Sequence, residues 1–187
     1  LSIRRQRQMC IRDSIYGYDR IPETLPVEVM GVGGVAPEVD AERRIRQLLL
    51  RAGLTEVLTL SLVRADDLER VGIPPDHPLR RAIPLRNPLT QEHTHLRTTL
   101  LPSLVEVLRT NRTRGNGDVH VFEVGRVFQA SEAGWEERKA VGIAQMGRSL
   151  RGTWNLPQEA VQASFHSLKG VVEGLLEALH LQGGEIQ

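Results

Sequence analysis

The sequence predicts an α+β fold in which helices pack against an antiparallel sheet. Two segments with the composition of strands, 119–129 and 139–146, are separated by a short polar turn, as in a β-hairpin. Three other segments repeat apolar residues at the spacing of an α-helix. Strands that pair locally and are interleaved with long helices are typical of this class. A chain of 187 residues, 40% of them hydrophobic, is long enough for one such domain and a short additional segment.

The first predicted helix spans residues 38–52, and Gly53 is expected to end it. Its apolar residues form one stripe along the helix: Ala41, Ile45, Leu48, Leu49 and Ala52. Leu50 lies off this stripe, which gives the helix a second apolar contact of the kind found at subunit interfaces. Packing inside the same domain explains the pattern at least as well.

The remaining elements follow from the same spacing rules. Residues 57–63 alternate leucines with other residues, which predicts a strand. Residues 64–88 predict mostly loop, with a helical turn at 65–70. A second helix runs from about Leu101 to a stop before Gly115, with Thr98 or Thr99 as its cap. The last helix covers residues 168–179, with a predicted cap at Ser167 and a stop at Gly183 and Gly184.

The composition of the chain argues against several classes of protein. The formal net charge is +1, so no overall electrostatic attraction to nucleic acid or membranes is expected. The single cysteine, Cys10, excludes an internal disulfide and suits a reducing compartment. No apolar run approaches the ~20 residues of a membrane helix, and residues 1–14 lack the apolar core of a signal peptide. We therefore expect a cytoplasmic protein with no membrane partner.

No motif of a catalytic centre is complete. The glycines of segment 31–34 lack both the remainder of a dinucleotide fingerprint and a Walker lysine. His93 and His95 have the spacing of two metal ligands, but no third ligand accompanies them, so surface histidines explain them better. Ser164 and Ser167 are not set in a nucleophile elbow. From the residues alone, the sequence predicts no catalytic site and no metal site.

The strongest local cluster of positive charge lies where the second helix ends, at Arg109, Arg112 and Arg114. Arginines in such a place can contact RNA phosphates. They also complement the negative end of a helix dipole, which needs no ligand. A stand-alone RNA-binding module that uses these arginines is the alternative function.

Three segments, in order, resemble the beta subunit of bacterial phenylalanyl-tRNA synthetase. IYGYDRIPETLP, residues 15–26, is similar to the end of that family's B5 domain and its exit linker. Residues 87–128, with their NPL turn, LRTTLLPSLVEVL helix and FEVGRVF strand, resemble the signature of the beta core. FHSLKGVVEGLLEAL, residues 165–179, resembles a later FDLKGVVEALLE-like segment.

The resemblance implies a domain arrangement, a fold and a set of partners. Residues 15–36 would be the end of the B5 domain and a linker, and residues 37–187 part of a catalytic-like core with the class II synthetase fold. Two alpha and two beta chains would together attach phenylalanine to its tRNA, with ATP and Mg²⁺, and the alpha chain would hold the catalytic site. The first helix would then lie at a subunit interface, through Ile45, Leu48, Leu49, Leu50 and Ala52.

Two sites that the parent complex would need are incomplete in this segment. A class II site needs an arginine after the strand that ends in Val127 and Phe128, to bind the ATP α-phosphate, but Gln129, Ala130, Ser131 and Glu132 follow instead. The family's acidic magnesium-binding segment is replaced by RRQRQMCIRDS, whose only acid is Asp13. We therefore expect this segment to bind neither ATP nor Mg²⁺, and residues 1–14 to be a non-native or disordered leader.

Overall fold

The computed structural model describes residues 11, 14–20, 22–25, 33–131, 134–148 and 162–181. The chain divides into two units, Leu1–Gly34 and Val35–Gln187. In the first unit, the 3-10 helix η1 (Tyr18–Arg20) follows Gly17, whose φ is 75°, and the Arg20 guanidinium lies 5.8 Å from the centre of the Tyr16 ring. Most of the predicted leader, residues 1–14, lies outside the described residues.

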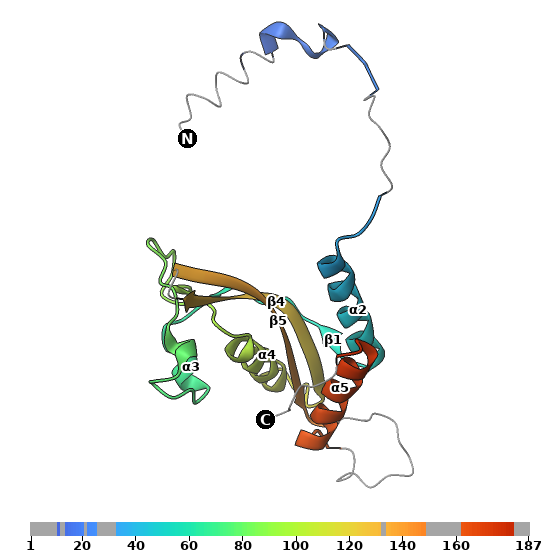
Figure 1. Cartoon of the computed structure of the whole chain (residues 1–187). Helices are drawn as coiled ribbons and strands as arrows, with labels where there is room; N and C mark the ends of the chain where they lie inside the picture. Colours follow the sequence, from blue (N-terminus) through green and yellow to red (C-terminus); the bar gives the residue numbers. More distant parts are fainter. Residues whose placement is uncertain are drawn as a thin grey trace. The chain divides into compact units, whose positions relative to one another are not determined.

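The second unit is built on a long β-hairpin, as the sequence predicts (Figure 1). Strand β4 (Val119–Ser131) pairs antiparallel with β5 (Gly134–Met146), and Gly134 adopts a φ of 125° at the turn, where a side chain would be strained. Strand β1 (Thr55–Glu56) pairs with β4 in parallel. The predicted antiparallel pairing is therefore confirmed for β4 and β5, whereas β1 makes the sheet mixed, in the order β1-β4-β5.

The single strand predicted for residues 57–63 is divided in two. Val57 donates its N–H to the carbonyl of Phe122 at 2.8 Å, and the chain then leaves the β4 backbone. It forms a strand again only as β2 (Leu62–Val63), which pairs antiparallel with β3 (His95–Leu96) in a second sheet. Residues 57–61 are not a strand, and in the middle of this segment Thr59 bonds to the Glu123 side chain instead of a neighbouring backbone.

The three long helices lie close to their predicted positions: α2 (Pro37–Arg51), α4 (Leu101–Thr113) and α5 (Phe165–Ala178). A four-residue helix, α3 (Asp67–Arg70), occupies the predicted turn, and η2 (Pro78–Arg80) follows it.

The predicted helix caps are partly wrong. Helix α5 begins earlier than expected, so its cap is Ser164. The two serines form a capping box, in which the Oγ of each accepts a hydrogen bond from the backbone N–H of the other. At α4 the N-cap residue is Leu100, which has no capping side chain. Thr99 accepts a weak bond from the Leu101 N–H at 3.3 Å, while the buried Thr98 donates to the carbonyl of Leu79. The predicted stop at residues 183–184 lies outside the described residues.

Helices cover both faces of the sheet, with α4 on one face and α2 and α5 on the other (Figure 1). Side chains of β4 alternate between the faces, so one strand serves two apolar clusters. The cluster on the α4 face comprises Leu100, Leu104, Val119, Val121 and Val127. The cluster on the other face comprises Leu49, Leu54, Phe122 and Val124. No helix among the described residues is both long and apolar enough to cross a membrane.

Ion pairs join α2 to both edges of the sheet. Glu42 accepts hydrogen bonds from Lys139 of β5 and, at 2.6 Å, from Arg46, which also bonds to Glu56 of β1 at 2.6 Å. Lys139 first, and then Arg46, hold the pKa of Glu42 below its ordinary value of 4.5. A carboxylate with a lowered folded-state pKa stabilises the fold above its unfolded pKa and loses this contribution as the pH falls through the folded value.

We expect Glu42→Gln to lower the stability of this unit by about 1 kcal/mol at neutral pH, since the pairs are only partly buried. The difference between the variant and the unchanged protein should shrink as the pH falls below about 4.5. Urea unfolding from about pH 2 to about pH 7, which extends about 2.5 units to each side of the ordinary carboxylate pKa of 4.5, measures this. A difference that does not depend on pH would show that the ion pairs do not carry the effect.

Candidate functional site

The residues predicted to form a subunit interface on α2 differ in how far each is buried within this unit. Leu49 is 1% exposed and packs against Leu54, Phe122 and Val124, so it belongs to the core of this unit. Ile45 is half-buried against the same cluster. Leu50, in contrast, is 51% exposed and is free to contact another chain. Participation of this helix in an interface remains a prediction.

The other two predicted interface residues line a groove between α2 and α5. Leu48 and Ala52 face Gly170 and Gly174 across a volume of about 330 Å³. A Cβ added at either glycine would meet nothing within 4 Å, so the groove is open there. Although α5 is rich in leucine and valine, none of its residues is fully buried. The helix contributes Val171 and Leu175 to the core and leaves much apolar surface uncovered.

A buried polar network, which the sequence analysis did not identify, lies on the α4 face of β4. Arg97 and Glu123 are 3% and 1% exposed, and the Arg97 Nη1 donates to Glu123 Oε1 at 2.8 Å. Arg97 also donates to the Thr59 Oγ1 at 2.8 Å and, through Nε, to the carbonyl of Arg126 at 2.8 Å. Thr59 in turn donates to Glu123 Oε2 at 2.6 Å. The network joins three parts of the chain that are distant in sequence.

Two glycines make room for side chains over this face of the sheet. A Cβ on Gly125 would lie 2.4 Å from Arg97 Nη2, and a Cβ on Gly142 would lie 2.6 Å from Leu104 Cδ1. The chain's own side chains therefore fill the space above the sheet. Gln129, Ala130 and Ser131 belong to β4, and Glu132 lies outside the described residues. That this segment does not bind ATP remains a prediction of the sequence, which has no arginine at 129–131.

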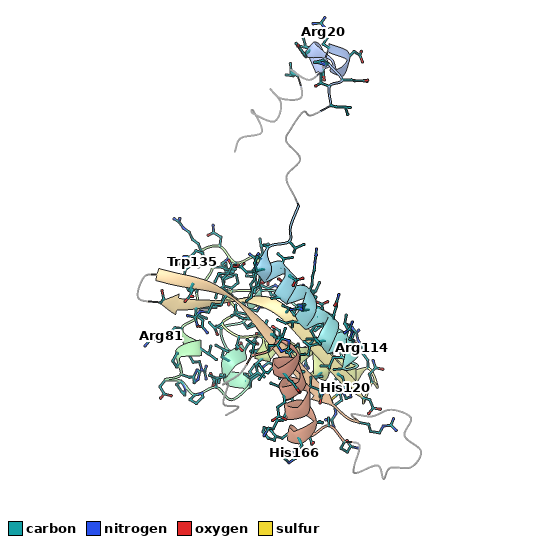
Figure 2. All side chains as sticks on the ribbon, turned by 45° about the vertical axis from the view of Figure 1, so that its right-hand side comes forward. Arg20, Arg81, Arg114, His120, Trp135 and His166 are labelled. Carbon is teal, nitrogen blue, oxygen red and sulfur yellow. The ribbon has the colours of Figure 1, made fainter. Side chains whose placement is uncertain are left out.

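The three arginines predicted as an RNA contact are all exposed, but they differ in their partners. Arg109 donates twice to the Glu106 carboxylate, at 2.6 and 2.7 Å, and this contact lowers the pKa of Glu106. Arg112 lies in the last turn of α4, and Arg114 is its C-cap residue. Arg114 lies at the opposite end of the hairpin from Trp135 (Figure 2). The carboxylate beside Arg109 weakens the attraction of this cluster for phosphate.

The histidines singled out from the sequence make local contacts. His93 Nδ1 lies 3.2 Å from the Thr90 hydroxyl, and His95 Nδ1 lies 2.9 Å from the Thr94 hydroxyl. Within the described parts of the chain, no three histidine, cysteine, aspartate or glutamate residues are grouped so that they could hold a metal ion.

The arrangement of these elements is that of the class II-like aminoacyl-tRNA synthetases. The structure is similar to pyrrolysyl-tRNA synthetase from Desulfitobacterium hafniense, with a TM-score of 0.61 and 20% identity over 81% of this chain and 50% of that chain. A second structure of this enzyme gives a TM-score of 0.58 at 18% identity. At these identities the similarity establishes the fold alone.

Sequence comparison identifies the particular family. Residues 21–187 match the model of the phenylalanyl tRNA synthetase beta chain CLM domain, and the chain belongs to this family. It is 39% identical over 165 residues to the phenylalanine--tRNA ligase beta subunit of Symbiobacterium thermophilum, covering 87% of this chain and 18% of that subunit. Over 170 residues it is 37% identical to the Moorella thermoacetica beta subunit, covering 90% of this chain and 21% of that subunit. The chain thus spans about a fifth of these relatives, and the resemblance stated from the sequence is confirmed at the level of the family.

Proposed function

We propose that this chain is a structural part of a phenylalanine--tRNA ligase beta subunit, which supports ATP-dependent attachment of phenylalanine to its tRNA by the alpha subunit. The observation that carries this proposal is the family match over residues 21–187. The filled α4 face of the sheet supports a non-catalytic role, because Arg97, Leu100 and Leu104 occupy the space above Gly125 and Gly142.

The finer assignments belong to the same proposal. Residues 15–36 are the end of a B5 domain and its linker, and residues 37–187 are part of a catalytic-like core. The chain divides two residues earlier, between Gly34 and Val35, which supports a boundary in this region. The complete assembly contains two alpha and two beta chains, binds the tRNA, and uses ATP and Mg²⁺ at the alpha subunit. Residues 1–14 are a leader of non-native origin; in-frame codons for them at the genomic locus would refute this.

Reconstitution tests the proposal. The full-length beta subunit and its companion alpha subunit are purified separately and together, and phenylalanine charging of tRNA is measured. We expect charging only when the two subunits form a complex. Charging by the beta subunit alone would overturn the assignment of catalysis to alpha.

A substitution on β4 tests the non-catalytic role of this segment. Gln129 stands where the class II pattern has its ATP-binding arginine, so Gln129→Ala in the complex should change kcat for charging by less than about twofold. Loss of a true phosphate-binding donor would lower it by a factor on the order of a hundred. A loss of that size, with the complex still assembled, would place a catalytic role here.

The alternative function, a stand-alone RNA-binding module, is not favoured. Its arginines include Arg109, whose charge is offset by Glu106. If this alternative were correct, replacing Arg109, Arg112 and Arg114 would weaken RNA binding and reduce its dependence on salt.

A further inference from the structure

A small cavity is lined by residues from β2, α3, η2, β3 and the start of α4. Its volume is about 80 Å³. A water molecule takes up about 30 Å³ of liquid, so the cavity has room for a few waters or one small oxyanion and not for a nucleoside. Among the described residues that line it, none is acidic. The polar part of the lining comprises Arg64, Arg80, His95, Arg97, Thr98 and Thr99.

Two backbone N–H groups of this lining have no acceptor in the protein. Thr98 and Thr99 lie between β3 and α4. Within the described residues, neither of these amides donates a hydrogen bond, although Thr98 is only 3% exposed. More than about nine in ten buried backbone N–H groups are paired with protein or with ordered water. Buried donors without a protein acceptor therefore indicate that a water or a bound anion accepts from them.

The start of α4 adds positive potential on the same side of the cavity. This helix has 13 residues, and its N-cap residue, Leu100, has no capping side chain. The second helical position is Pro102, which lines the cavity and has no N–H to donate. The N-terminus of a helix carries the equivalent of about half a positive charge and favours a phosphate group nearby. An anion in the cavity would lie beside this uncapped end.

Arg80 carries a charge that is held in place by a neutral group. Its Nε and Nη2 donate to the carbonyl of Ile73 at 3.0 and 2.6 Å, and its side chain is 21% exposed. The carboxylate of Glu69 lies 3.8 Å from Nη1 and is 75% exposed, so it offsets little of this charge. A guanidinium that is already fixed loses little conformational entropy when it binds an oxyanion.

The other two arginines are compensated from outside the cavity. Arg97 is paired with Glu123 at 2.8 Å, and Arg64 with Asp66 at 3.0 Å. A second acid, Glu92, lies 3.8 Å from Arg64. None of these three acids belongs to the lining. Arg97 donates through Nε and Nη1, and in the part of the chain that the structure describes its Nη2 makes no hydrogen bond. The wall of the cavity therefore presents more donors than acceptors.

We propose that this cavity binds one phosphate group, either as the free ion or at the end of a small ester. Arg80 supplies charge-assisted hydrogen bonds, and the amides of Thr98 and Thr99 donate to the other oxygens. Phosphate suits the cavity better than a carboxylate, because its oxygens point in four directions and the donors come from several elements. This inference goes beyond the proposed function and does not depend on it.

Calorimetric titration of the full-length beta subunit with inorganic phosphate, at constant ionic strength, tests the proposal. Arg80→Gln should raise the Kd for phosphate at least about tenfold, because a charge-assisted bond is lost. Arg81→Gln is the matched control, since Arg81 is the adjacent residue, is exposed and lies outside the lining (Figure 2). It should alter Kd by less than about twofold. Equal effects of the two substitutions would assign the binding to general surface charge and overturn the proposal, as would the absence of any binding.

A second substitution separates binding from folding, because Arg80 also supports the backbone at Ile73. Arg64 lines the same cavity and is 42% exposed, so Arg64→Gln should leave the circular dichroism spectrum unchanged. It should raise the Kd for phosphate at least about threefold, since one of the cationic groups of the wall is removed. An unchanged Kd in this variant, together with an altered spectrum in Arg80→Gln, would contradict the assignment.

A parallel titration with adenosine monophosphate distinguishes the two sources of the phosphate group. A nucleoside does not fit the cavity and must remain outside it. Binding of adenosine monophosphate as tight as that of phosphate would identify an ester as a ligand, and binding of phosphate alone would identify the free ion. Either result supports the site, provided that Arg80→Gln weakens it.

Hydrogen exchange observes the same site in the unchanged protein. With saturating phosphate, the amides of Thr98 and Thr99 should exchange at least about fivefold more slowly than in chloride at the same ionic strength. Phosphate that binds while both amides exchange as before would place the ion elsewhere and overturn the inference. None of these measurements uses the alpha subunit, so their failure would leave the proposed function standing.

Discussion

Leu49→Asp is expected to unfold the second unit and not merely to weaken an interface. Leu49 is 1% exposed and packs in the cluster around Phe122. Removing a buried leucine side chain alone costs about 2–5 kcal/mol, and a carboxylate in the same place adds a desolvation penalty. The sum is comparable to the whole stability of a domain, about 5–15 kcal/mol. Circular dichroism and limited proteolysis of the full-length beta subunit would report the loss of structure.

Leu50, the next residue along the helix, is expected to tolerate the same substitution. Leu50 is 51% exposed on the same helix, so Leu50→Asp should leave the fold intact. If α2 contacts another subunit, this second substitution should lower the yield of assembled complex while the circular dichroism spectrum stays the same. A folded Leu49→Asp protein that fails to assemble would contradict the placement of Leu49 in the core.

The sequence could predict α2 but not what covers each of its sides. The spacing of Ile45, Leu48 and Leu49 shows that these residues share a face of a helix. It does not show whether that face meets the same chain or another one, because both kinds of contact select the same residue types. Only the position of Phe122, more than 70 residues later, places Leu49 in the core.

The hairpin was predictable because its pairing is local, whereas the segment after α2 was not. Alternating leucines at 58, 60 and 62 predict one strand with one buried face, yet Leu58 and Leu60 lie outside the core. A side-chain contact, between Thr59 and Glu123, replaces backbone pairing there. Contacts between side chains 64 positions apart leave no periodic signal. The parallel pairing of β1 with β4 escaped prediction in the same way, because β1 has only two residues.

Breaking the buried network at Glu123 is expected to have the second large effect. Glu123→Ala would leave the Arg97 guanidinium buried with no carboxylate beside it, and Thr59 would lose its acceptor. Removing one partner of a buried ion pair costs about 3–5 kcal/mol, because the remaining charge stays away from water. Native-state hydrogen exchange of the β4 amides in the full-length beta subunit should show a fall of that size in the free energy of opening.

Replacing both charges tests whether the unpaired arginine causes this loss. Arg97→Met combined with Glu123→Leu removes the buried charges and keeps apolar volume, so the double variant should be more stable than Glu123→Ala alone. The exposed pair Arg138 and Glu136 offers a matched control on the other strand of the hairpin, and its removal should leave exchange of the β4 amides unchanged. If the double variant were no more stable than the single one, the network would act through its shape and hydrogen bonds, and not through the pairing of two charges.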